Sequence, residues 1–459
     1  MESIWNQDVE RKERKPLEKN RTVQTVVIGA GMAGILTAYF LKKKGADVIV
    51  VEAKRVASGQ TGGTTAKITS QHGMIYDKLT RKVGREKAKA YALANEEAIH
   101  MYEQIVKEEN ISCHFEKRPA YLYTVREEGV KELKKEAEAA TALGIKARLI
   151  EGSQITGLPF EVSAGVCFAD QAQFHPLEFI KHLADKLEIY ENTKVLSVKK
   201  HMVFTDKGNI RAENIVFATH YPITNIPGFY FLRQHQERSY VLALKEQKEL
   251  SGMYYSIDEK GLSLRSAGSI LLLGGGGHRT GKCKEKEKNC RNQEIGYTYL
   301  RKMAQTYYPD AKEAGAWSAQ DCMSHDEIPF IGKYSILRPY WYVATGFKKW
   351  GMTSSMVAAM TISNQIWGSS DSYETIFTPQ RFLFRASIKN LMIDIGESLQ
   401  GLGKGIFAGK KRRCPHMGCR LEWNEEESGW ECPCHGSGFD GAGELKDNPA
   451  QIDLTDKLR

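Results

Sequence analysis

The sequence predicts an α/β chain, α+β overall, that is divided into several domains, and three observations predict it. An apolar strand at residues 25–28 runs directly into the motif G-A-G-M-A-G (29–34), which an apolar helical run and a second strand follow. Later segments such as 238–244 have the composition of strands, and a group of cysteines and histidines lies near the end of the chain. A chain of 459 residues is also too long for one hydrophobic core.

The N-terminal motif is the fingerprint of a dinucleotide-binding Rossmann unit. Strand, G-x-G-x-x-G, helix, second strand and terminal acid all occur in order. Gly29 would make the tight turn, Gly31 would let a pyrophosphate approach the backbone, and Gly34 would let the helix pack on the strand. The phosphates would lie at the helix N-terminus, where free N–H groups and the helix dipole favour anions. Glu52 ends the second strand, so we expect it to bind ribose hydroxyls, which disfavours NADP.

Segments further along the chain favour FAD. A Gly- and Thr-rich stretch (58–67) follows the second strand, and the run Y-V-A-T-G-F (342–347) leads into a further helix. With strand segments at 193–198 and 215–219, their order over residues 22–370 resembles that of the D-amino-acid-oxidase-type FAD-dependent oxidoreductases, which include glycine and sarcosine oxidases. The resemblance implies a Rossmann-like FAD-binding domain with an inserted antiparallel-sheet substrate domain.

The same resemblance implies where the flavin would lie. The backbone at Val195 should meet the adenine, and Thr64 and Thr65 should lie near the isoalloxazine ring, although both threonines could equally be ordinary turn residues. The helix that begins after Gly351 should point its N-terminus at the pyrimidine edge of the ring, where it would stabilise the negative charge of the reduced flavin. The full set of expected FAD-binding residues is Gly29, Gly31, Gly34, Glu52, Thr64, Thr65, Val195, Gly346, Gly351 and Met352.

One departure from the family concerns the substrate. Members that oxidise amino acids carry an arginine for the substrate carboxylate a few residues before a D-x-x-P-x-I-G stretch, which is residues 326–332 here. In the family's spacing the arginine position falls on Asp321, and a carboxylate cannot clamp a carboxylate. Arg265 and Arg238 are alternative candidates, unless each is a surface arginine. His278, after a run of four glycines, is a further polar candidate.

The C-terminal cysteines and histidines form a metal-ligand pattern. They read C-x-H (414–416) and C-x-x-H (432–435), separated by fifteen residues. Paired Cys and His in this order are typical of a [2Fe–2S] cluster with both cysteines on one iron and both histidines on the other. Zinc also takes two cysteines and two histidines, so a zinc knuckle is the alternative. The expected ligands are Cys414, His416, Cys432 and His435.

The text around these ligands, C-P-H-M-G-C and C-P-C-H-G-S-G-F, resembles the Rieske family over roughly the last sixty residues. The resemblance implies a disulfide between Cys419 and Cys434 that ties the two cluster-binding loops together. High-potential Rieske proteins also donate serine and tyrosine hydroxyls to the cluster. This chain keeps the serine as Ser437 but has Phe439 at the tyrosine position. Little sequence precedes the first ligand, so we expect a shortened base sheet.

These signals divide the chain into parts. Residues 88–109 and 127–143 have the pattern of amphipathic helices, and 238–244 and 269–273 that of strands. The predicted parts are a polar lead (1–21), the FAD-binding domain (22–80, 150–222 and 320–370), the substrate domain (81–149 and 223–319), a linker (371–399) that is helical or extended, and a small all-β Rieske domain (400–459).

Charge limits the partners. The net charge is +9, with a dense basic patch at Lys404, Lys410, Lys411, Arg412 and Arg413. No nucleic-acid-reading motif accompanies the patch, so we expect no nucleic-acid partner. The patch could steer an acidic, soluble electron carrier of the ferredoxin or flavodoxin type, or it could be a solvated linker.

The apolar runs, the N-terminal residues and the cysteines together predict where in the cell the protein lies. No run of about twenty apolar residues is present, so no transmembrane segment is expected. The N-terminal residues lack the apolar core of a signal peptide. The remaining cysteines are scattered as free thiols, and the expected location is the cytoplasm. They are Cys113, Cys167, Cys283, Cys290 and Cys322.

Together the two cofactors predict an FAD-dependent oxidoreductase. An amine or amino-acid-like substrate would give a hydride to the flavin, and electrons would pass singly to the Rieske cluster and then to an external carrier. Two alternatives stay open: an amine oxidase that uses oxygen and has a vestigial Rieske domain, and a non-catalytic redox sensor or electron relay. The sequence offers no recognisable second set of two histidines and a carboxylate, which disfavours a mononuclear-iron oxygenase.

Overall fold

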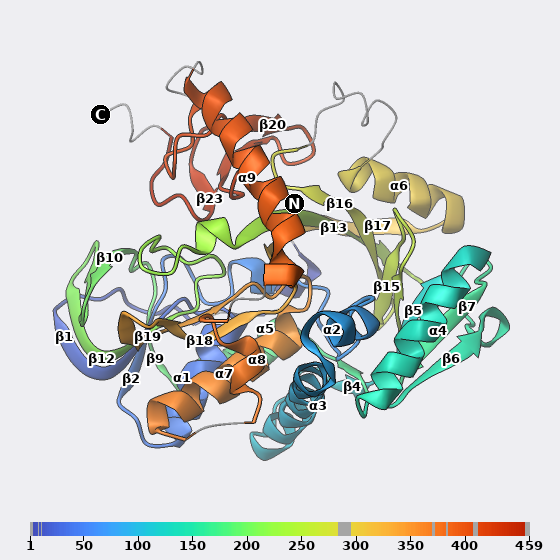
Figure 1. Cartoon of the computed structure of the whole chain (residues 1–459), viewed down its shortest axis with the longest axis horizontal. Helices are drawn as coiled ribbons and strands as arrows, with labels where there is room; N and C mark the ends of the chain where they lie inside the picture. Colours follow the sequence, from blue (N-terminus) through green and yellow to red (C-terminus); the bar gives the residue numbers. More distant parts are fainter. Residues whose placement is uncertain are drawn as a thin grey trace.

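A computed structural model of the chain describes residues 3–7, 9–10, 12–282, 295–369, 372–381, 384–406 and 412–454. Its main parts are two eight-stranded sheets, helices packed on them, and a small four-stranded unit at the C-terminus (Figure 1). The predicted α/β class, α+β overall, is confirmed. Two of the predictions fall partly outside the described residues: the thiols Cys283 and Cys290, and Lys410 and Lys411 of the basic patch.

The first sheet is mixed and contains the fingerprint. Its path is β10-β11-β12-β1-β2-β9, and β19 joins it beside β12 and pairs in turn with β18. The strands β1, β2, β9, β12 and β19 run parallel to their neighbours in this set. The bounds are β1 (Arg21–Ile28), β2 (Val48–Val51), β9 (Glu188–Tyr190), β10 (Val195–Lys199), β11 (Met202–Thr205), β12 (Asn209–Phe217), β18 (Phe330–Ser335) and β19 (Arg338–Thr345).

The apolar run at the end of β1 is buried on both faces of this sheet. Val27 belongs to the large core beneath the helices, whereas Val26 and Ile28 belong to a second core on the opposite face. Neighbouring side chains of a strand point to opposite faces, and parallel strands covered on both sides are apolar throughout. This explains why the strand reads as a continuous apolar run in the sequence.

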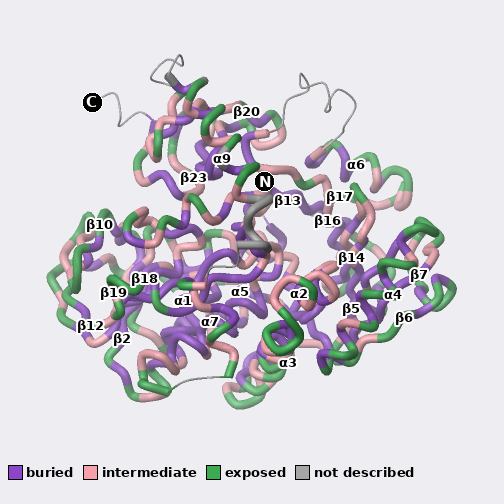
Figure 2. Tube along the Cα trace, viewed as in Figure 1, coloured by how far each residue is buried: buried purple, intermediate pink, exposed green. Residues whose placement is uncertain are grey.

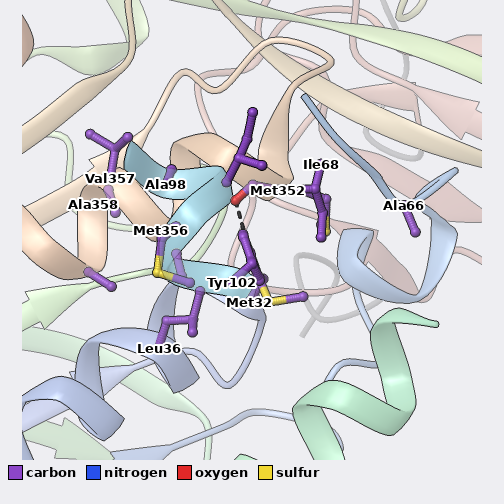
Figure 3. Close-up of a cluster of buried hydrophobic side chains, with 14 of the residues drawn as sticks. Met32, Leu36, Ala66, Ile68, Ala98, Tyr102, Met352, Met356, Val357 and Ala358 are labelled. Atoms are coloured by element: carbon purple, nitrogen blue, oxygen red, sulfur yellow. Dashed lines mark hydrogen bonds between the residues drawn. The ribbon is translucent and has the colours of Figure 1, made fainter. Parts of the chain in front are cut away.

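Helices cover the Val27 face. Helix α1 (Met32–Lys43) follows the fingerprint loop and packs against α7 (Gly351–Trp367), which in turn packs against α3 (Arg85–Glu108). The Tyr102 hydroxyl of α3 donates a hydrogen bond to the Met352 carbonyl at 2.9 Å, amid buried methionine and aliphatic side chains (Figure 3). The start of α7 is therefore fixed by a long helix from elsewhere in the chain.

The second sheet has the order β17-β13-β16-β15-β14-β5-β7-β6 and is mostly antiparallel. Helices α4 (Glu127–Ala142) and α6 (Gly296–Tyr307) pack on it, and their outer faces are exposed (Figure 2). Strand β7 falls in a range predicted for the first domain but pairs here; the domain ranges as a whole stay a prediction. The bounds are β5 (Ala120–Thr124), β6 (Ala147–Glu151), β7 (Ala164–Phe168), β13 (Gln234–Lys245), β14 (Met253–Ser256), β15 (Ser263–Ala267), β16 (Ile270–Arg279) and β17 (Lys312–Ser324).

The C-terminal unit begins with a long helix, α9 (Phe384–Ile406), and ends in four strands of three residues each. It lies above β13 and β16 in Figure 1. Four cysteines take part in its small apolar core. Its strands are β20 (Glu422–Asn424), β21 (Gly429–Glu431), β22 (Gly438–Asp440) and β23 (Leu445–Asp447).

The remaining elements are short. They are η1 (Ile4–Asn6), η2 (Gln60–Gly63), η3 (Gly152–Gln154), η4 (Tyr230–Leu232), β3 (Lys67–Ile68), β4 (Glu116–Lys117), β8 (Ala172–Gln173), α2 (Tyr76–Val83), α5 (Pro176–Ala184) and α8 (Glu374–Phe377).

Candidate functional site

A cavity of about 1250 Å³ opens where β1 meets α1 and extends to the second sheet. The fingerprint loop lines one part of it and the N-terminus of α7 another. Of the residues expected to bind FAD, the structure brings eight to its wall. They are Gly29, Gly31, Glu52, Thr64, Thr65, Val195, Gly351 and Met352.

The glycines of the fingerprint differ in what a side chain would meet. A Cβ on Gly29, whose φ is +103°, would lie 2.5 Å from the Ala218 carbonyl oxygen, and one on Gly34 would lie 1.9 Å from the Gly29 carbonyl oxygen. Those two glycines therefore allow the turn and the helix–strand contact. A Cβ on Gly31 would meet only the Thr61 hydroxyl, at 3.1 Å, and would otherwise project into open space. The backbone at Gly31 is thus left bare toward the cavity, as a bound pyrophosphate requires.

Glu52 ties this loop to the end of β2. Its carboxylate accepts hydrogen bonds from the Ala30 amide at 2.8 Å and the Lys54 amide at 2.9 Å. Burial raises the pKa of Glu52, and these two amides oppose that effect. Each carboxylate oxygen keeps a further lone pair, so Glu52 can fix the loop and still accept from a ribose hydroxyl.

Of the other predicted flavin-binding residues, some line the cavity and others only shape the backbone around it. The Thr64 hydroxyl accepts from the Ala66 amide at 2.9 Å, as a turn residue does, although Thr64 also lines the cavity. Gly346 does not line it; with φ +73° it makes the turn after β19. Gly351 begins α7, whose first residues face the cavity with their unpaired amides. An anionic ring edge would be stabilised there.

The candidates for the substrate site do not converge. The buried Arg265 guanidinium donates to the Thr65 and Ala66 carbonyls at 2.8 and 2.9 Å and does not line the cavity. His278 forms a hydrogen bond with the Tyr240 hydroxyl at 2.9 Å, and His278 itself does not line the cavity. Of the four candidates, Asp321 and Arg238 lie at the cavity wall.

Arg238 is engaged with the C-terminal unit. Its Nε lies 2.6 Å from Glu431 Oε1, and its terminal nitrogens reach Ser318 Oγ at 2.8 Å and Asp447 Oδ2 at 3.3 Å. The Arg238 and Glu431 side chains are 7% and 3% exposed. Glu427 Oε2 also lies 3.7 Å from the guanidinium. With three carboxylates of the C-terminal unit around it, Arg238 has little capacity for a substrate carboxylate, so the structure assigns it to the contact between units.

The four predicted cluster ligands come together at the tips of two loops. The Cys414 and Cys432 side chains lie in hydrogen-bond contact, and the His416 and His435 rings lie 4.9 Å apart at 88°. Nδ1 of each histidine is buried and has no hydrogen-bond partner among the described residues. Burial lowers the pKa of His416 to about 4 and that of His435 to about 3, so both rings are neutral. Two thiols and two neutral imidazoles with bare nitrogens fit an iron–sulfur cluster.

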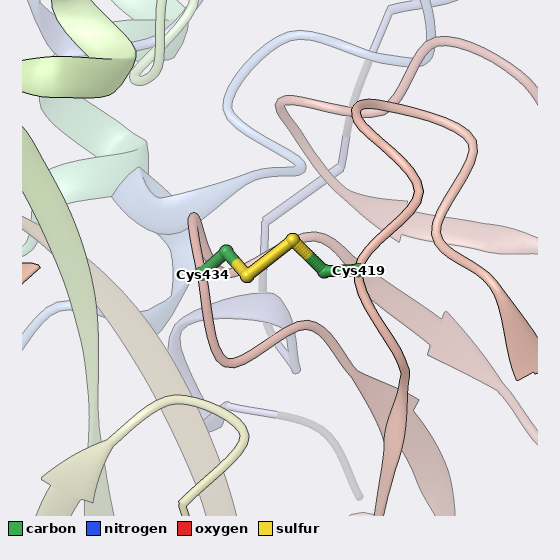
Figure 4. Close-up of a disulfide and its surroundings, with 2 residues drawn as sticks. All are labelled: Cys419 and Cys434. Carbon is green, nitrogen blue, oxygen red and sulfur yellow. A yellow bond between two sulfur atoms is a disulfide. The ribbon is translucent and has the colours of Figure 1, made fainter. Parts of the chain in front are cut away.

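A disulfide joins Cys419 and Cys434, the pair that the resemblance implied, and it links the two loops (Figure 4). These sulfurs lie within 4.8 Å of the Cys432 thiol. Because a disulfide sulfur is not a thiolate, they are structural neighbours of the cluster rather than ligands. Ser437 is fully buried beside them, and its hydroxyl accepts from the Ala450 amide at 3.0 Å.

The cluster face of the C-terminal unit packs against the rest of the chain. Nε2 of His416 lies 3.0 Å from Oδ1 of Asn225, and the Gln236 amide donates to the His435 carbonyl at 2.9 Å. On the cavity side, Gln60 donates to Asp447 at 3.0 Å. Asp447 and Asn448, which follow the cluster loops, line the same cavity as the fingerprint. The two expected cofactor sites therefore share a wall.

Helix α9 is fixed by a cluster that the sequence did not reveal. His235, His325 and Asp394 place ligand-type atoms within 4.8 Å of one another, so the prediction that the chain has no second set of two histidines and a carboxylate is wrong. Arg279 also pairs with Asp394. A fixed guanidinium on the same carboxylate disfavours a metal dication, and the group acts as an ion-pair cluster. Asp394 lies 159 residues from His235, so no local pattern could have indicated the contact.

Comparison with known proteins identifies the larger part of the chain and its C-terminal unit. Residues 24–365 match the family described as FAD dependent oxidoreductase, and residues 390–456 match the Rieske [2Fe-2S] domain. The chain is 35% identical over 507 residues to the Rieske 2Fe-2S iron-sulfur protein YhfW of Bacillus subtilis (strain 168), covering 99% of this chain and 98% of that protein.

Solved structures share the fold of the larger part. L-proline dehydrogenase from P. horikoshii superposes with a TM-score of 0.64 at 19% identity, over 79% of this chain and 98% of that one. Glycine oxidase from Geobacillus kaustophilus superposes with a TM-score of 0.66 at 15% identity, over 79% of this chain and 99% of that one. Within the part of the chain that the structure describes, none of the helices is both long and apolar enough to cross a membrane.

Proposed function

The chain belongs to the FAD dependent oxidoreductase family and carries a Rieske domain, so it is an oxidoreductase with FAD and a [2Fe–2S] cluster, and we propose that it oxidises an amine or amino-acid-like substrate. The electrons would then go to the cluster of the same chain. Bound FAD would accept a hydride from the substrate carbon, and the cluster would carry single electrons. An external carrier would receive them last.

One observation carries the proposal: residues of the Rieske unit line the flavin cavity. Asp447 and Asn448 belong to its wall, and Gln60, next to the Gly- and Thr-rich segment, donates to Asp447 at 3.0 Å. A vestigial domain would not need to be held there by a buried ion pair such as Arg238 with Glu431. This arrangement supports electron transfer within the chain over the alternative of an oxidase with an idle Rieske domain.

The residues of the chain have distinct roles in this proposal. Cys414, Cys432, His416 and His435 hold the cluster. The bare backbone at Gly31 and the N-terminus of α7 hold the two ends of FAD. The names of the structural relatives, a proline dehydrogenase and a glycine oxidase, support a substrate with an oxidisable C–H bond next to nitrogen.

The external carrier is the least constrained part. We propose a soluble acidic protein of the ferredoxin or flavodoxin type, in the cytoplasm, because the chain has an excess of nine positive charges and opposite charge accelerates encounter.

Anaerobic titration tests the proposal. Purified holoprotein is mixed with a panel of amines and amino acids while flavin absorbance and the electron spin resonance signal of the reduced cluster are recorded. The expected result is a substrate that bleaches the flavin and also produces the cluster signal. In the matched Cys432→Ala variant the flavin should bleach without that signal. Bleaching with no cluster signal in the wild type, together with stoichiometric peroxide in air, would favour the oxidase. No bleaching by any compound would favour the non-catalytic relay.

A further inference from the structure

Strands β13 and β17 form a wall with different chemistry on its two faces. They pair in register, with Glu237 opposite Asp321 and Arg238 opposite Gln320. Alternate side chains of a strand point to opposite faces. Arg238 reaches the Rieske unit, so Glu237 and Asp321 point to the other face of the pair; Arg238 and Asp321 both contribute to the cavity wall.

Asp321 is a half-buried carboxylate with few hydrogen-bond partners. Its contact among the described residues is the Ser239 hydroxyl, which lies 3.3 Å from Oδ2, and no described cation lies within the 4.0 Å of an ion pair. Nearby Asp326 is buried, and its carboxylate accepts hydrogen bonds from the Arg381 guanidinium at 2.7 and 3.0 Å. A carboxylate with a structural role is paired in the manner of Asp326. Asp321 instead faces open space with most of its lone pairs bare.

The charged groups around Asp321 do not neutralise it. Lys349, from the loop before α7, also lines the cavity, but its Nζ lies 3.3 Å from Glu237 Oε2 and pairs there. Lys348 pairs with Glu327 at 3.7 Å. Arg238, on the opposite face, is bound to Glu431. Burial raises the pKa of Asp321 to about 7, with Lys349 lowering it and Glu237 raising it.

We propose that Asp321 is the proton acceptor for the substrate ammonium, a role that rests on the proposed function and narrows the substrate to amines that bind as cations. Amines are protonated at neutral pH, and an ammonium nitrogen has no lone pair with which to form a C=N bond. The ammonium N–H bond breaks, its proton goes to the Asp321 carboxylate, and a neutral amine remains. When FAD is bound, it would accept the hydride, with its electron pair, from the substrate C–H bond, and the nitrogen lone pair of the neutral amine would then form the C=N bond of an iminium ion. The Asp321 proton returns to solvent.

An arginine attracts the carboxylate end of a substrate, whereas Asp321 attracts its nitrogen. The Ser239 hydroxyl can donate to the ionised carboxylate, so it favours the form that accepts the proton.

The first test measures binding and not turnover. Tetramethylammonium is a cation without an N–H bond, and its affinity for the FAD-loaded chain is measured by calorimetry from pH 6 to pH 8 in two buffers. Binding should tighten by about tenfold across this range, because the carboxylate must lose its proton first, and it should release a proton at pH 6. Asp321→Asn should abolish both effects. Glu313→Gln, which removes an exposed carboxylate at the far end of β17, should keep them.

The second test uses the pH profile of flavin reduction by the substrate in a single turnover. Asp321→Asn should reduce the rate at pH 7 by at least tenfold, and the rate should recover as the pH approaches the pKa of the free amine. Ser239→Ala should move the wild-type profile to higher pH, which keeps the idea testable if Asp321→Asn does not fold. An unchanged profile and unchanged tetramethylammonium binding in both variants would overturn the role of Asp321 while the proposed function stands. If no amine reduces the flavin but the binding is pH-dependent only with Asp321 present, the cation site stands and the proposed function fails.

Discussion

Oδ1 of Asn225 lies 3.0 Å from Nε2 of His416, so a residue outside the C-terminal unit makes a hydrogen bond to a proposed cluster ligand. An amide oxygen only accepts, and Nε2 must therefore carry the hydrogen. The other nitrogen, Nδ1, then has a bare lone pair and is buried without a partner among the described residues. The hydrogen bond thus selects the tautomer that can bind iron through Nδ1.

The first prediction is that Asn225 lowers the reduction potential of the cluster. An acceptor on the ligand N–H makes the imidazole more basic and favours the oxidised cluster. Asn225→Leu should raise the potential by at most about 65 mV, which corresponds to a hydrogen bond of about 1.5 kcal/mol at about 59 mV per tenfold for one electron. Potentiometric titration checks it. Asn225→Asp, which keeps a stronger acceptor, should shift the potential the other way, and a rise in both variants would contradict the argument.

The second prediction concerns the bare backbone at Gly31. Gly31→Val should abolish FAD binding with little effect on the fold, because its Cβ would meet only the Thr61 hydroxyl in the free chain and would collide with a bound pyrophosphate. Flavin stoichiometry and circular dichroism are the measurements. A Cβ on Gly396 of α9 meets nothing within 4 Å, so Gly396→Ala is the control and should retain full FAD. Stoichiometric FAD in folded Gly31→Val would show that the pyrophosphate lies elsewhere.

How much the sequence could predict depends on how far apart the interacting residues lie. The fingerprint and the cluster loops are local patterns, in which each residue's role follows from its neighbours, and their families are confirmed. Arg238 has no such pattern: its partner Glu431 is 193 residues away, and the sequence alone made it a substrate candidate. The orientation of Asp321 likewise depends on the register between β13 and β17, which no local composition specifies.

The third prediction concerns the ion pair between Arg238 and Glu431. Removing one partner of a buried pair leaves an uncompensated charge, so Arg238→Met should destabilise the docking of the Rieske unit by about 3–5 kcal/mol. Electron transfer from flavin to cluster should slow, whereas reduction of the flavin by substrate should be much less affected. Denaturant unfolding and stopped-flow absorbance measure the two effects.

A double variant and a surface variant control this experiment. Arg238→Met with Glu431→Leu removes both charges and should recover most of the stability. Arg81→Met breaks an exposed pair with Asp77 and should cost less than about 1 kcal/mol. Equal effects of Arg238→Met and Arg81→Met would mean that the buried pair does not hold the units together.

The fourth prediction is a pH window for the attachment of α9. Burial would lower the pKa of His235, but hydrogen bonds to Asp394 and Glu237 raise it. Burial would raise the pKa of Asp394, but the two histidines hold it well below its usual range. A histidine whose pKa is raised in the folded state stabilises the attachment fully below its unfolded pKa of about 6.5. It loses this effect as the pH rises through its folded pKa. An aspartate whose pKa is lowered in the folded state stabilises the attachment above its unfolded pKa of about 3.9. It loses this effect as the pH falls through its folded pKa.

The attachment should therefore be firmest between about pH 4 and 6.5 and weaken toward alkaline pH. Hydrogen exchange of the α9 backbone, corrected for the intrinsic rate, should show protection that falls between pH 6 and 8.5. In His235→Gln the fall should be smaller, because the titrating group is gone. An equal fall in both proteins would exclude His235 as its origin.

The last prediction concerns the hydroxyl groups around the cluster. The pKa of the Cys414 thiol is lowered to about 7, chiefly by the Cys432 side chain and in part by the Ser437 hydroxyl. A hydroxyl that donates to a thiolate ligand stabilises the reduced, more negative cluster and raises its potential. Phe439, which is buried in the same small core, cannot donate. The potential should thus lie within the Rieske range of roughly −150 to +300 mV but below that of clusters that receive both hydroxyls.

Ser437→Ala should lower this potential further, and Phe439→Tyr should raise it if the new hydroxyl reaches the cluster. Potentiometric titration of both variants against the wild type decides it, with Trp423→Phe as a control on the exposed side of the unit. An unchanged potential in Ser437→Ala would show that the Ser437 hydroxyl does not raise the reduction potential of the cluster. A mid-range potential matters for the proposed function, because such a cluster can accept electrons from a reduced flavin and still pass them to a soluble carrier.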